Sequence, residues 1–316
     1  MTSKRNIFCF VLLALAAAPC FAAEGGLRAA VSVGRDGDGA LLLSGADCGT
    51  LERQAAALGA WRTRLHEETG ATGVCRCAGE TCELRVASVA PDFVNRMHGV
   101  KAGRWGPNCW DTALVSDKIL SAPSFTSPEE MAFWMKSPLC RAVGVREVPR
   151  PGDIIALRDQ AGEEVHGFIY LTEELSFSKN YLTVAAPYAL QSPDDVYAEF
   201  PVDKECRNPG SSAACAVRSD YFRCSTLQDY LATANLPADV DYPGAAAVVS
   251  EAERTISDIA MRWKTNPEIQ NNAQAVLASK KEALLPVRDL SSRHSGLLWT
   301  ALTLRIDSLL HQIDLI

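Results

Sequence analysis

The sequence has no cluster of lysine and arginine beyond its first residues, and its formal net charge is −7 at pH 7. Nucleic acids and anionic membrane surfaces are bound by concentrated positive charge, so this composition argues against both as partners. Beyond residue 23 the chain also lacks a hydrophobic run long enough to cross a bilayer. With 47% hydrophobic and 22% charged residues, the remainder predicts a globular protein with a sizeable core.

Residues 1–23 have the pattern of a secretory signal peptide. Two basic residues near the start precede an almost wholly apolar stretch, residues 7–18, and small residues follow. We expect cleavage after Ala22 or Ala23 and export to the periplasm or the cell exterior. Lipid attachment at Cys20 is the alternative, and the proline before that cysteine disfavours it.

Cysteine is abundant, but its number is odd. Two of the eleven cysteines lie in the predicted signal, which leaves nine in the exported chain. An oxidising compartment favours pairing, and an odd number leaves at least one thiol free. We predict that Cys109 is the free thiol, because two groups of three other cysteines flank a turn at residues 78–81 and bracket a Pro/Gly/Ser-rich loop, as disulfide-stapled structure does. The other eight cysteines can form four disulfides, but the sequence does not reveal how they pair. They are Cys48, Cys75, Cys77, Cys82, Cys140, Cys206, Cys215 and Cys224.

Zinc is the competing use of clustered cysteines. Cys75, Cys77 and Cys82 follow a C-x-C-x4-C pattern, but no histidine lies nearby in the sequence. Zinc sites of secreted chains need a more complete ligand set than this. We therefore expect no metal and no other cofactor.

Residues 24–91 predict a small α+β region that carries disulfides. A helix is expected over residues 50–68, where apolar residues recur at helical spacing. Residues 74–76 and 83–87 predict a hairpin across the turn between the clustered cysteines.

Residues 92–240 predict a core of helices followed by an antiparallel sheet, which is an α+β order. Asn108 is expected to cap a helix over residues 109–120, and Ser127 followed by proline opens another. Four strands are then expected, at residues 153–157, 165–171, 175–178 and 182–185.

Residues 241–316 predict long amphipathic helices. Apolar residues repeat at alternating spacings of three and four over residues 249–263 and 302–316. A third helix is expected around residues 269–285, stopped by Pro286. These helices favour an antiparallel hairpin or bundle that closes on itself, and a self-association or docking arm is the alternative.

Cys109 and His166 are the candidate nucleophile and base. A helix N-terminus lowers the pKa of a thiol at its first turn, and the thiolate is the nucleophilic form. An imidazole at the start of a strand can take the thiol proton and return it to a leaving amine. Taken alone the pair is a weak signal, because a lone cysteine or histidine more often has a structural role.

Three surrounding motifs strengthen the signal. They are Asn108-Cys109-Trp110 after a Gly-Pro turn, Pro151-Gly152-Asp153-Ile154-Ile155, and His166-Gly167-Phe168-Ile169-Tyr170-Leu171. Together they resemble the NlpC-type branch of the papain-like cysteine peptidases and amide hydrolases, over about residues 104–200. The resemblance implies a papain-like helix-plus-antiparallel-sheet core, with Cys109 as nucleophile and His166 as base.

The resemblance also implies a third, polar residue on the strand after the histidine. Ser178 aligns with this position, and Asn180 is the alternative because an amide is the stronger hydrogen-bond partner. The family more often has histidine, asparagine, glutamine or an acid here, so this chain departs from the usual pattern.

Exported NlpC-type proteins mostly cleave amide bonds in peptidoglycan stem peptides. The resemblance therefore implies a periplasmic or secreted cysteine hydrolase of such peptides, acting through an acyl-enzyme on Cys109. A papain-like hydrolase or acyltransferase acting on proteins or lipids is one alternative. A non-catalytic envelope binding or scaffold protein is the other.

Overall fold

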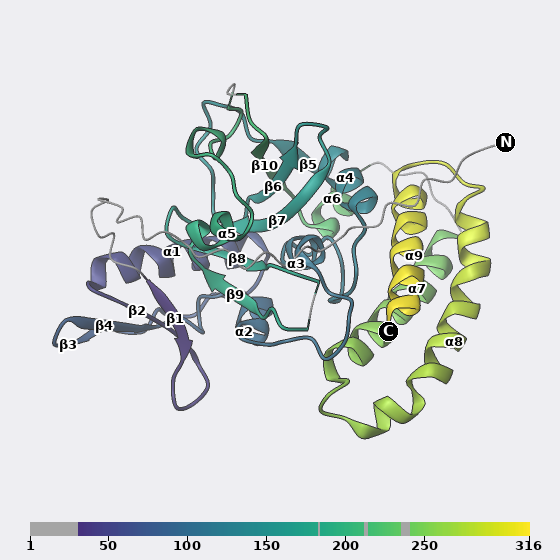
Figure 1. Cartoon of the computed structure of the whole chain (residues 1–316), viewed down its shortest axis with the longest axis horizontal. Coiled ribbons are helices and arrows are strands. Elements are labelled where there is room, and N and C mark those ends of the chain that lie inside the picture. Colours follow the sequence, from purple (N-terminus) through teal and green to yellow (C-terminus); the bar gives the residue numbers. More distant parts are fainter. Residues whose placement is uncertain (1–30, 183, 212–213, 235–240) are drawn as a thin grey trace, which may run out of the picture.

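The computed structural model describes residues 31–182, 184–211, 214–234 and 241–316. The predicted signal peptide and its cleavage site lie outside these residues. The chain is a mixed α+β protein with two antiparallel sheets and a C-terminal bundle of helices (Figure 1). These features confirm the α+β class, the disulfides of the N-terminal region and the C-terminal bundle.

The N-terminal sheet has the strand order β1-β2-β4-β3. Its strands are β1 (Ser32–Arg35), β2 (Leu41–Gly45), β3 (Arg76–Ala78) and β4 (Thr81–Arg85). Helix α1 (Cys48–Arg64) packs on this sheet and begins after Asp47, whose side chain accepts a hydrogen bond from the Thr50 amide. Leu41, Leu43 and Leu84 are buried at alternate strand positions. The predicted helix and hairpin are confirmed, each with shifted ends.

The central sheet has six strands in the order β5-β10-β6-β7-β8-β9. They are β5 (Cys140–Ala142), β6 (Ile154–Asp159), β7 (Glu164–Tyr170), β8 (Ser176–Lys179), β9 (Tyr188–Gln191) and β10 (Val217–Cys224). Among the described helices, only α5 (Pro193–Glu199) and η1 (Lys204–Cys206) connect two of these strands, β9 and β10. Helices α2 (Asp92–Met97), α3 (Cys109–Ser116) and α4 (Pro128–Lys136) precede β5, and α6 (Leu227–Thr233) follows β10.

Both faces of the central sheet are covered. Helices α3 and α4 pack on one face, where Ile154 and Ile169 belong to the main core. Helix α5 covers the other face, where Ile155 and Phe168 belong to a separate core. Neighbouring residues of a strand therefore enter different cores, as the alternation of side chains requires.

One predicted strand is wrong. In the region 182–185, the described residues form a bend and a turn, and Thr183 lies outside the described residues. The strand that pairs with β8 is β9, which begins directly after Pro187. Tyr188 and Leu190 of β9 are buried, so pairing there places two large side chains in the core.

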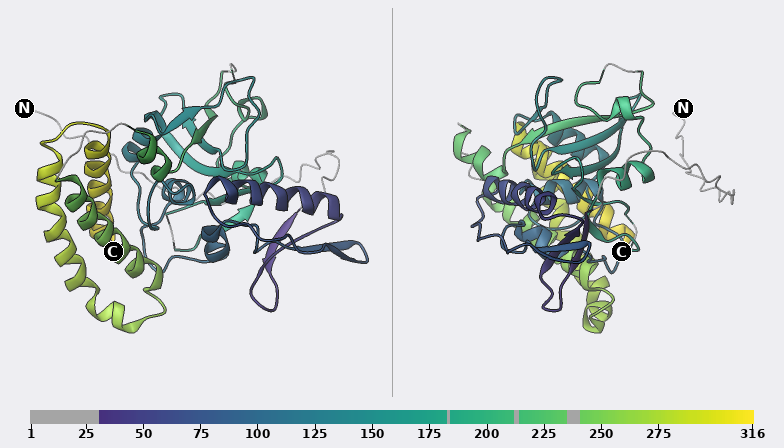
Figure 2. Two further views of the ribbon diagram at one scale, coloured as in Figure 1. Left: turned by 180° about the vertical axis from the view of Figure 1, so that it is seen from behind. Right: turned by 90° about the vertical axis from the view of Figure 1, so that its left-hand side faces the viewer.

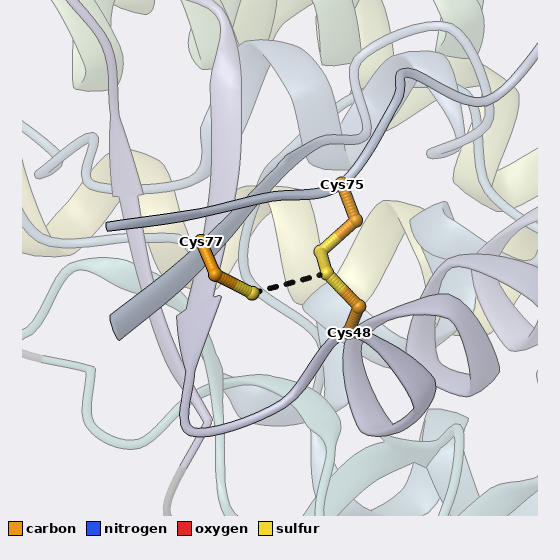
Figure 3. A group of neighbouring side chains, drawn as sticks. All are labelled: Cys48, Cys75 and Cys77. Carbon is orange, nitrogen blue, oxygen red and sulfur yellow. Dashed lines mark hydrogen bonds between the residues drawn. A yellow bond between two sulfur atoms is a disulfide. The ribbon is translucent and has the colours of Figure 1, made fainter. Parts of the chain in front are cut away.

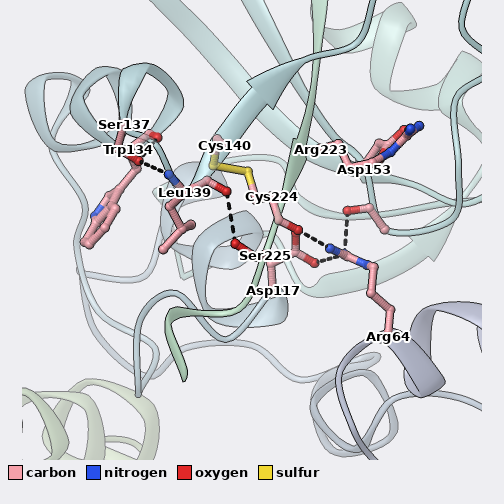
Figure 4. The surroundings of a disulfide bond; sticks show 11 residues. Arg64, Asp117, Trp134, Ser137, Leu139, Cys140, Asp153, Arg223, Cys224 and Ser225 are labelled. Atoms are coloured by element: carbon pink, nitrogen blue, oxygen red, sulfur yellow. Dashed lines mark hydrogen bonds and ion pairs between the residues drawn. A yellow bond between two sulfur atoms is a disulfide. The ribbon is translucent and has the colours of Figure 1, made fainter. Parts of the chain in front are cut away.

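Four disulfides join eight cysteines and leave Cys109 as the free cysteine of the described chain, which confirms the prediction. The pairs are Cys48–Cys75, Cys77–Cys82, Cys140–Cys224 and Cys206–Cys215. The bridge from Cys140 to Cys224 joins β5 to β10, two strands that are far apart in the sequence (Figure 4).

Arg64, near the end of α1, attaches the N-terminal region to the central sheet. It forms an ion pair with buried Asp117, and it donates to the carbonyls of Cys224 at 2.6 Å and Gly152 at 2.8 Å (Figure 4). Gly152 has a φ of +92°, and a Cβ there would lie 2.2 Å from the Arg64 guanidinium. The glycine of the Pro-Gly-Asp turn therefore serves both the turn and this contact.

The C-terminal bundle consists of α7 (Tyr242–Arg262), α8 (Pro267–Ser291) and α9 (Leu297–Leu315). The three helices share their own core, so the bundle closes on itself. Helix α9 also packs against α4, whereas α8 lies on the side away from the central sheet (Figures 1 and 2). In the described part of the chain, no helix is both long and apolar enough to cross a membrane.

The predicted end of the third helix is wrong, because Pro286 lies inside α8. Proline removes one backbone hydrogen bond and crowds the preceding turn. Leu284 is fully buried in the bundle core, and Val287 and Leu290 pack against the same core. Burial on both sides of the proline therefore outweighs the lost hydrogen bond.

Candidate active site

Cys109 is the first residue of α3, as the sequence predicts. The Asn108 side chain accepts a hydrogen bond from the Asp111 amide at 2.9 Å and donates to the Thr126 carbonyl at 2.7 Å. The cap thus satisfies one free amide of the helix start and attaches it to the loop before α4. Cys109 is held at a well-defined position by this arrangement.

The turn before Cys109 lies against helix α9. Gly106 has a φ of 156°, and a Cβ on it would lie 1.9 Å from Nε2 of Gln312. The Gln312 side chain also accepts a hydrogen bond from the Phe125 amide at 2.8 Å, and Ser308 accepts one from the Ser127 amide at 3.1 Å. A helix from the far end of the chain therefore supports the segments on both sides of α3.

The Cys109 side chain is buried against strand β7, and only 9% of the residue is exposed. The paired part of the β7–β8 ladder ends at Ile169 and Phe177. Two residues before Ile169 on β7, the backbone amide of Gly167 donates a hydrogen bond to the cysteine. The thiol therefore occupies a place where a strand partner would otherwise sit.

Burial controls the ionisation of this thiol. It raises the pKa of Cys109 to about 11, and the backbone amides of Gly167, Trp110 and Cys109 itself act in the opposite direction. The charge of Lys179 also lowers the thiol pKa. In the described conformation burial prevails, so Cys109 is a protonated thiol at neutral pH.

Lys179 lies on the same face of the sheet as Cys109. It follows Phe177 by two residues on β8, and Phe177 belongs to the main core on the α3 side, so the alternation of side chains places Lys179 on that side too. Lys179 is fully buried, which lowers its pKa to about 8, and its ammonium group donates to the Tyr181 carbonyl. A buried cation is thus close enough to the thiol to influence it.

His166 lies on the opposite face of β7. A Cβ on Gly167 would meet Trp110 and Met131 on the α3 side, so the neighbouring side chain must point to the α5 side. There the imidazole stacks on Phe200, with ring centres 3.9 Å apart and planes 9° apart. Burial lowers the pKa of His166 to about 3. Among the described residues, no hydrogen bond joins His166 to Cys109.

His166 does contact Ser178, the predicted third residue. The Ser178 hydroxyl lies 3.3 Å from Nε2 of His166 and donates to Oδ1 of Asn180 at 2.5 Å. Asn180 donates in turn to Glu199 at 2.7 Å. A hydroxyl has one proton to give, so Ser178 accepts from His166, and the imidazole is the Nε2–H tautomer.

This network leaves Nδ1 of His166 with an unused lone pair. Within the described part of the chain, that nitrogen is buried and has no hydrogen-bond partner. Both candidates for the third residue take part: Ser178 touches the imidazole, and Asn180 orients the Ser178 hydroxyl. The structure thus brings His166 and Ser178 together and leaves Cys109 on the other side of β7.

Comparisons of the chain with protein-family models, with curated proteins and with solved structures found no match. The chemistry of the site must therefore be argued from its own residues. They supply a free thiol surrounded by backbone amides, a neutral imidazole with one open nitrogen, and a buried cation. Acyl transfer through a cysteine uses a thiol and an imidazole base, and here the two lie on opposite faces of β7.

Sequence reasoning missed the buried charges behind Cys109. Arg305 of α9 is buried and pairs with Glu130 at 3.0 Å and Glu253 at 3.4 Å. Its charge also acts on Asp111, two residues after the nucleophile candidate. Burial nevertheless raises the pKa of Asp111 well above its usual value. Three carboxyl groups share one guanidinium here, so the cluster favours a protonated Asp111.

The positions of Lys179 near Cys109 and of Phe200 over His166 were also missed; as a third residue, Lys179 is a poor candidate because it only donates. The available signal for Lys179 was its position two residues after Phe177, because alternate strand residues share a face. Phe200 follows α5, and no local pattern predicts that its ring covers a histidine.

Two surface hollows lie away from these residues. One, of about 1280 Å³, lies among α2, α6 and α7 and includes Met97, Leu120 and Met261 in its lining. A smaller one, of about 600 Å³, lies beside Val145 and Gly210. Neither is lined by Cys109, His166 or Ser178.

One group among the described residues has the spacing of metal ligands. The sulfurs of Cys48, Cys75 and Cys77 all lie within 4.8 Å of one another (Figure 3). All three are in disulfides, two in the bridge Cys48–Cys75 and one in the bridge Cys77–Cys82. A metal ligand must be a thiolate, so the group offers no metal site in this oxidised state.

Proposed function

We propose that the chain is an exported thiol hydrolase of the papain-like, NlpC type. It cleaves amide bonds in peptidoglycan stem peptides, with Cys109 as nucleophile and His166 as base. The observation that carries the proposal is the hydrogen bonding of His166. Its Nε2–H donates a hydrogen bond to the Ser178 hydroxyl, and its buried Nδ1 has no hydrogen-bond partner among the described residues. Buried polar atoms without partners are rare in native proteins, and a catalytic role is one explanation.

The chemistry follows from these groups. The imidazole takes the Cys109 proton on Nδ1, and the thiolate attacks the carbonyl carbon of the scissile amide. The imidazolium then protonates the amine as the C–N bond breaks, which leaves a thioester on Cys109. Water, deprotonated by the same imidazole, hydrolyses this thioester and restores the thiol. No cofactor is needed.

The proposal requires a rearrangement on substrate binding. In the described conformation the sulfur and the imidazole are on opposite faces of β7, and Phe200 covers the imidazole. The imidazole has to turn toward the open end of the β7–β8 ladder, where Gly167 donates to the cysteine. The Phe200 side chain has to move first, because its ring lies directly on His166.

Incubation with purified sacculi tests the proposal. Wild-type protein should release peptide fragments that mass spectrometry identifies, and Cys109→Ala and His166→Ala should each abolish the release. His66→Ala is the matched control, because His66 is an exposed histidine paired with Asp229. Release that persists in Cys109→Ala would contradict the assigned nucleophile. Absence of release by the wild-type protein would contradict the substrate.

Activity on other substrates is the second candidate. The same Cys–His chemistry acts on protein amides or lipid esters, or transfers an acyl group, in related papain-like proteins. A covalent acyl adduct on Cys109 from an activated ester, without release from sacculi, would favour this reading.

A non-catalytic envelope binding protein is the third candidate. It is favoured by the burial of both Cys109 and His166 and by their separation across β7. Under this candidate the thiol only packs, and no acyl adduct forms on Cys109 with any substrate. Trapping the adduct by mass spectrometry of the intact protein separates it from the two enzymatic candidates.

A further inference from the structure

Two disulfides lie against each other at the edge of the N-terminal sheet. The bridge Cys48–Cys75 joins the start of α1 to the segment before β3, and Cys77–Cys82 crosses the β3–β4 hairpin. Sγ of Cys77 lies 3.5 Å from Sγ of Cys48. Figure 3 shows the Cys77 side chain pointing at the neighbouring bridge. Neither sulfur carries a proton while oxidised, so this is a direct sulfur–sulfur contact.

This pair of bridges is also accessible. Strand β3 is the edge strand of its sheet, and all three of its residues are exposed, Cys77 included. Cys48 and Cys75 are half-buried. In the other two bridges, Cys140, Cys206 and Cys224 are buried and Cys215 is half-buried. A thiol in solution therefore reaches the sulfur of Cys77 most directly.

We propose that Cys48, Cys75, Cys77 and Cys82 form a thiol–disulfide exchange site whose substrate is a dithiol. The dithiol attacks Cys77 and releases Cys82, and its second thiol then releases Cys77. The Cys77 thiolate attacks Cys48, its nearest sulfur in the neighbouring bridge, and Cys75 leaves. The site uses none of the residues of the proposed hydrolase.

The exchange balances in atoms and electrons. The dithiol loses two electrons and two protons and becomes a disulfide, while Cys77–Cys82 gains them and becomes two thiols. The second step is redox-neutral: the bond from Cys48 to Cys75 breaks, the bond from Cys48 to Cys77 forms, and Cys75 takes up the proton. The products are the bridge Cys48–Cys77 and free thiols at Cys75 and Cys82.

The exchange changes what the bridge holds. In the oxidised protein the start of α1 is tied to residue 75, which fixes the connection over residues 65–75 at both ends. After exchange the start of α1 is tied to β3 instead, and this connection is released at Cys75. Oxidation of a dithiol at this site thus changes which residue is bonded to Cys48, from Cys75 to Cys77.

The variant Cys82→Ser isolates the second step, because it leaves a Cys77 thiol beside the intact bridge Cys48–Cys75. After acid quenching, denaturation and alkylation, peptide mass spectrometry locates the free thiols. The label should be divided between Cys77 and Cys75, and peptides linked through Cys48 and Cys77 should appear. Cys109 takes up one label in every sample and serves as the internal reference.

Cys215→Ser is the matched control. It leaves a thiol at Cys206, and here the label should stay on Cys206 alone. A label confined to Cys77 in the Cys82→Ser protein would overturn the proposal. So would a share on Cys75 that falls on dilution, because exchange within one chain does not depend on protein concentration.

The wild-type protein gives a second measurement that needs no variant. Treatment with one equivalent of dithiothreitol should place label on Cys82 and divide the rest between Cys75 and Cys77, with peptides linked through Cys48 and Cys77 present. Label confined to Cys77 and Cys82, with no peptide linked through Cys48 and Cys77, would show simple reduction and would also overturn the proposal.

Discussion

Lys179 is a fully buried lysine on the Cys109 face of the central sheet. Burying an ammonium group is costly, and the pKa of Lys179 falls to about 8 for that reason. It still carries its charge most of the time at neutral pH, and that charge favours the thiolate of Cys109. The charge of Lys179 therefore lowers the pKa of the thiol, whereas burial raises it.

Replacement of Lys179 by methionine should make Cys109 less acidic. We expect the pH profile of alkylation by iodoacetamide to move to higher pH, with rates near pH 7 lower by less than about tenfold, since one pKa unit is a tenfold change in thiolate. Lys136→Met is the control, because Lys136 is exposed on α4. An unchanged profile in Lys179→Met would show that the charge does not act on the thiol.

His166 should stay neutral over the physiological pH range. Burial lowers its pKa to about 3, whereas an unfolded histidine titrates near about 6.5. The unfolded chain therefore binds a proton that the folded chain does not, and stability is lost as pH falls from about 6.5 toward 3. Histidine nitrogen NMR should show the Nε2–H tautomer from pH 5 to pH 8.

Ser178→Ala tests the tautomer. It leaves the buried Nε2–H without an acceptor, which should cost about 1–3 kcal/mol of stability and change the nitrogen shifts of His166. Ser176→Ala is the matched variant, because Ser176 is a buried serine of the same strand whose hydroxyl donates to the Gln191 carbonyl. It should leave the His166 shifts unchanged. His166 nitrogen shifts that are the same in both variants would contradict the assigned network.

At the scale of elements, helix α9 is the part of the bundle that reaches the candidate site. Gln312 and Ser308 bind the loop between α3 and α4, and Arg305 donates to the Phe125 carbonyl of that loop at 2.8 Å. Arg305 also pairs with Glu130 on α4 and Glu253 on α7. One buried side chain thereby joins three helices and the loop.

Arg305→Met should be strongly destabilising, because it leaves buried carboxylates without their cation. We expect a loss of about 3–5 kcal/mol in the free energy of unfolding, measured in urea by tryptophan fluorescence. Arg288→Met removes an exposed ion pair with Asp307 in the same bundle and should cost less than about 1 kcal/mol. Equal effects of the two variants would contradict the role given to the buried cluster.

At the scale of the whole molecule, the three predicted regions are joined by buried contacts. Arg64 ties α1 to Asp117 and to the Gly152 turn of the central sheet. Arg305 and Gln312 tie the bundle to the loop after α3. The boundaries expected at residues 91 and 240 stay predictions, but these contacts indicate that the regions stabilise one another.

A chain shortened before residue 241 should therefore lose more than its bundle. Without α9, the turn at Gly106 and the loop before α4 lose their supports, and Cys109 becomes accessible. We expect faster alkylation of Cys109 and a lower, broader urea transition than in the full chain. A shortened chain with the same midpoint and the same alkylation rate would show that the central region folds independently.

The sequence by itself determined the features that depend on short-range chemistry or on counting. Asn108 and Ser127 cap their helices because a side-chain oxygen reaches an amide three residues away. An odd number of cysteines in an oxidising compartment left one thiol free, and the turn and loop beside other cysteines distinguished Cys109 from them. Hairpins and amphipathic helices followed from their periodicity.

Only the tertiary structure decided which distant segments meet and on which face. Cys140 forms a disulfide with Cys224, 84 residues away, and no local sequence pattern predicts that pairing. The face of β7 that receives His166, the burial of Lys179 and the reach of Arg305 depend on how separate elements pack. Local preferences act within a few residues, whereas burial is shared among segments that only the complete fold brings together.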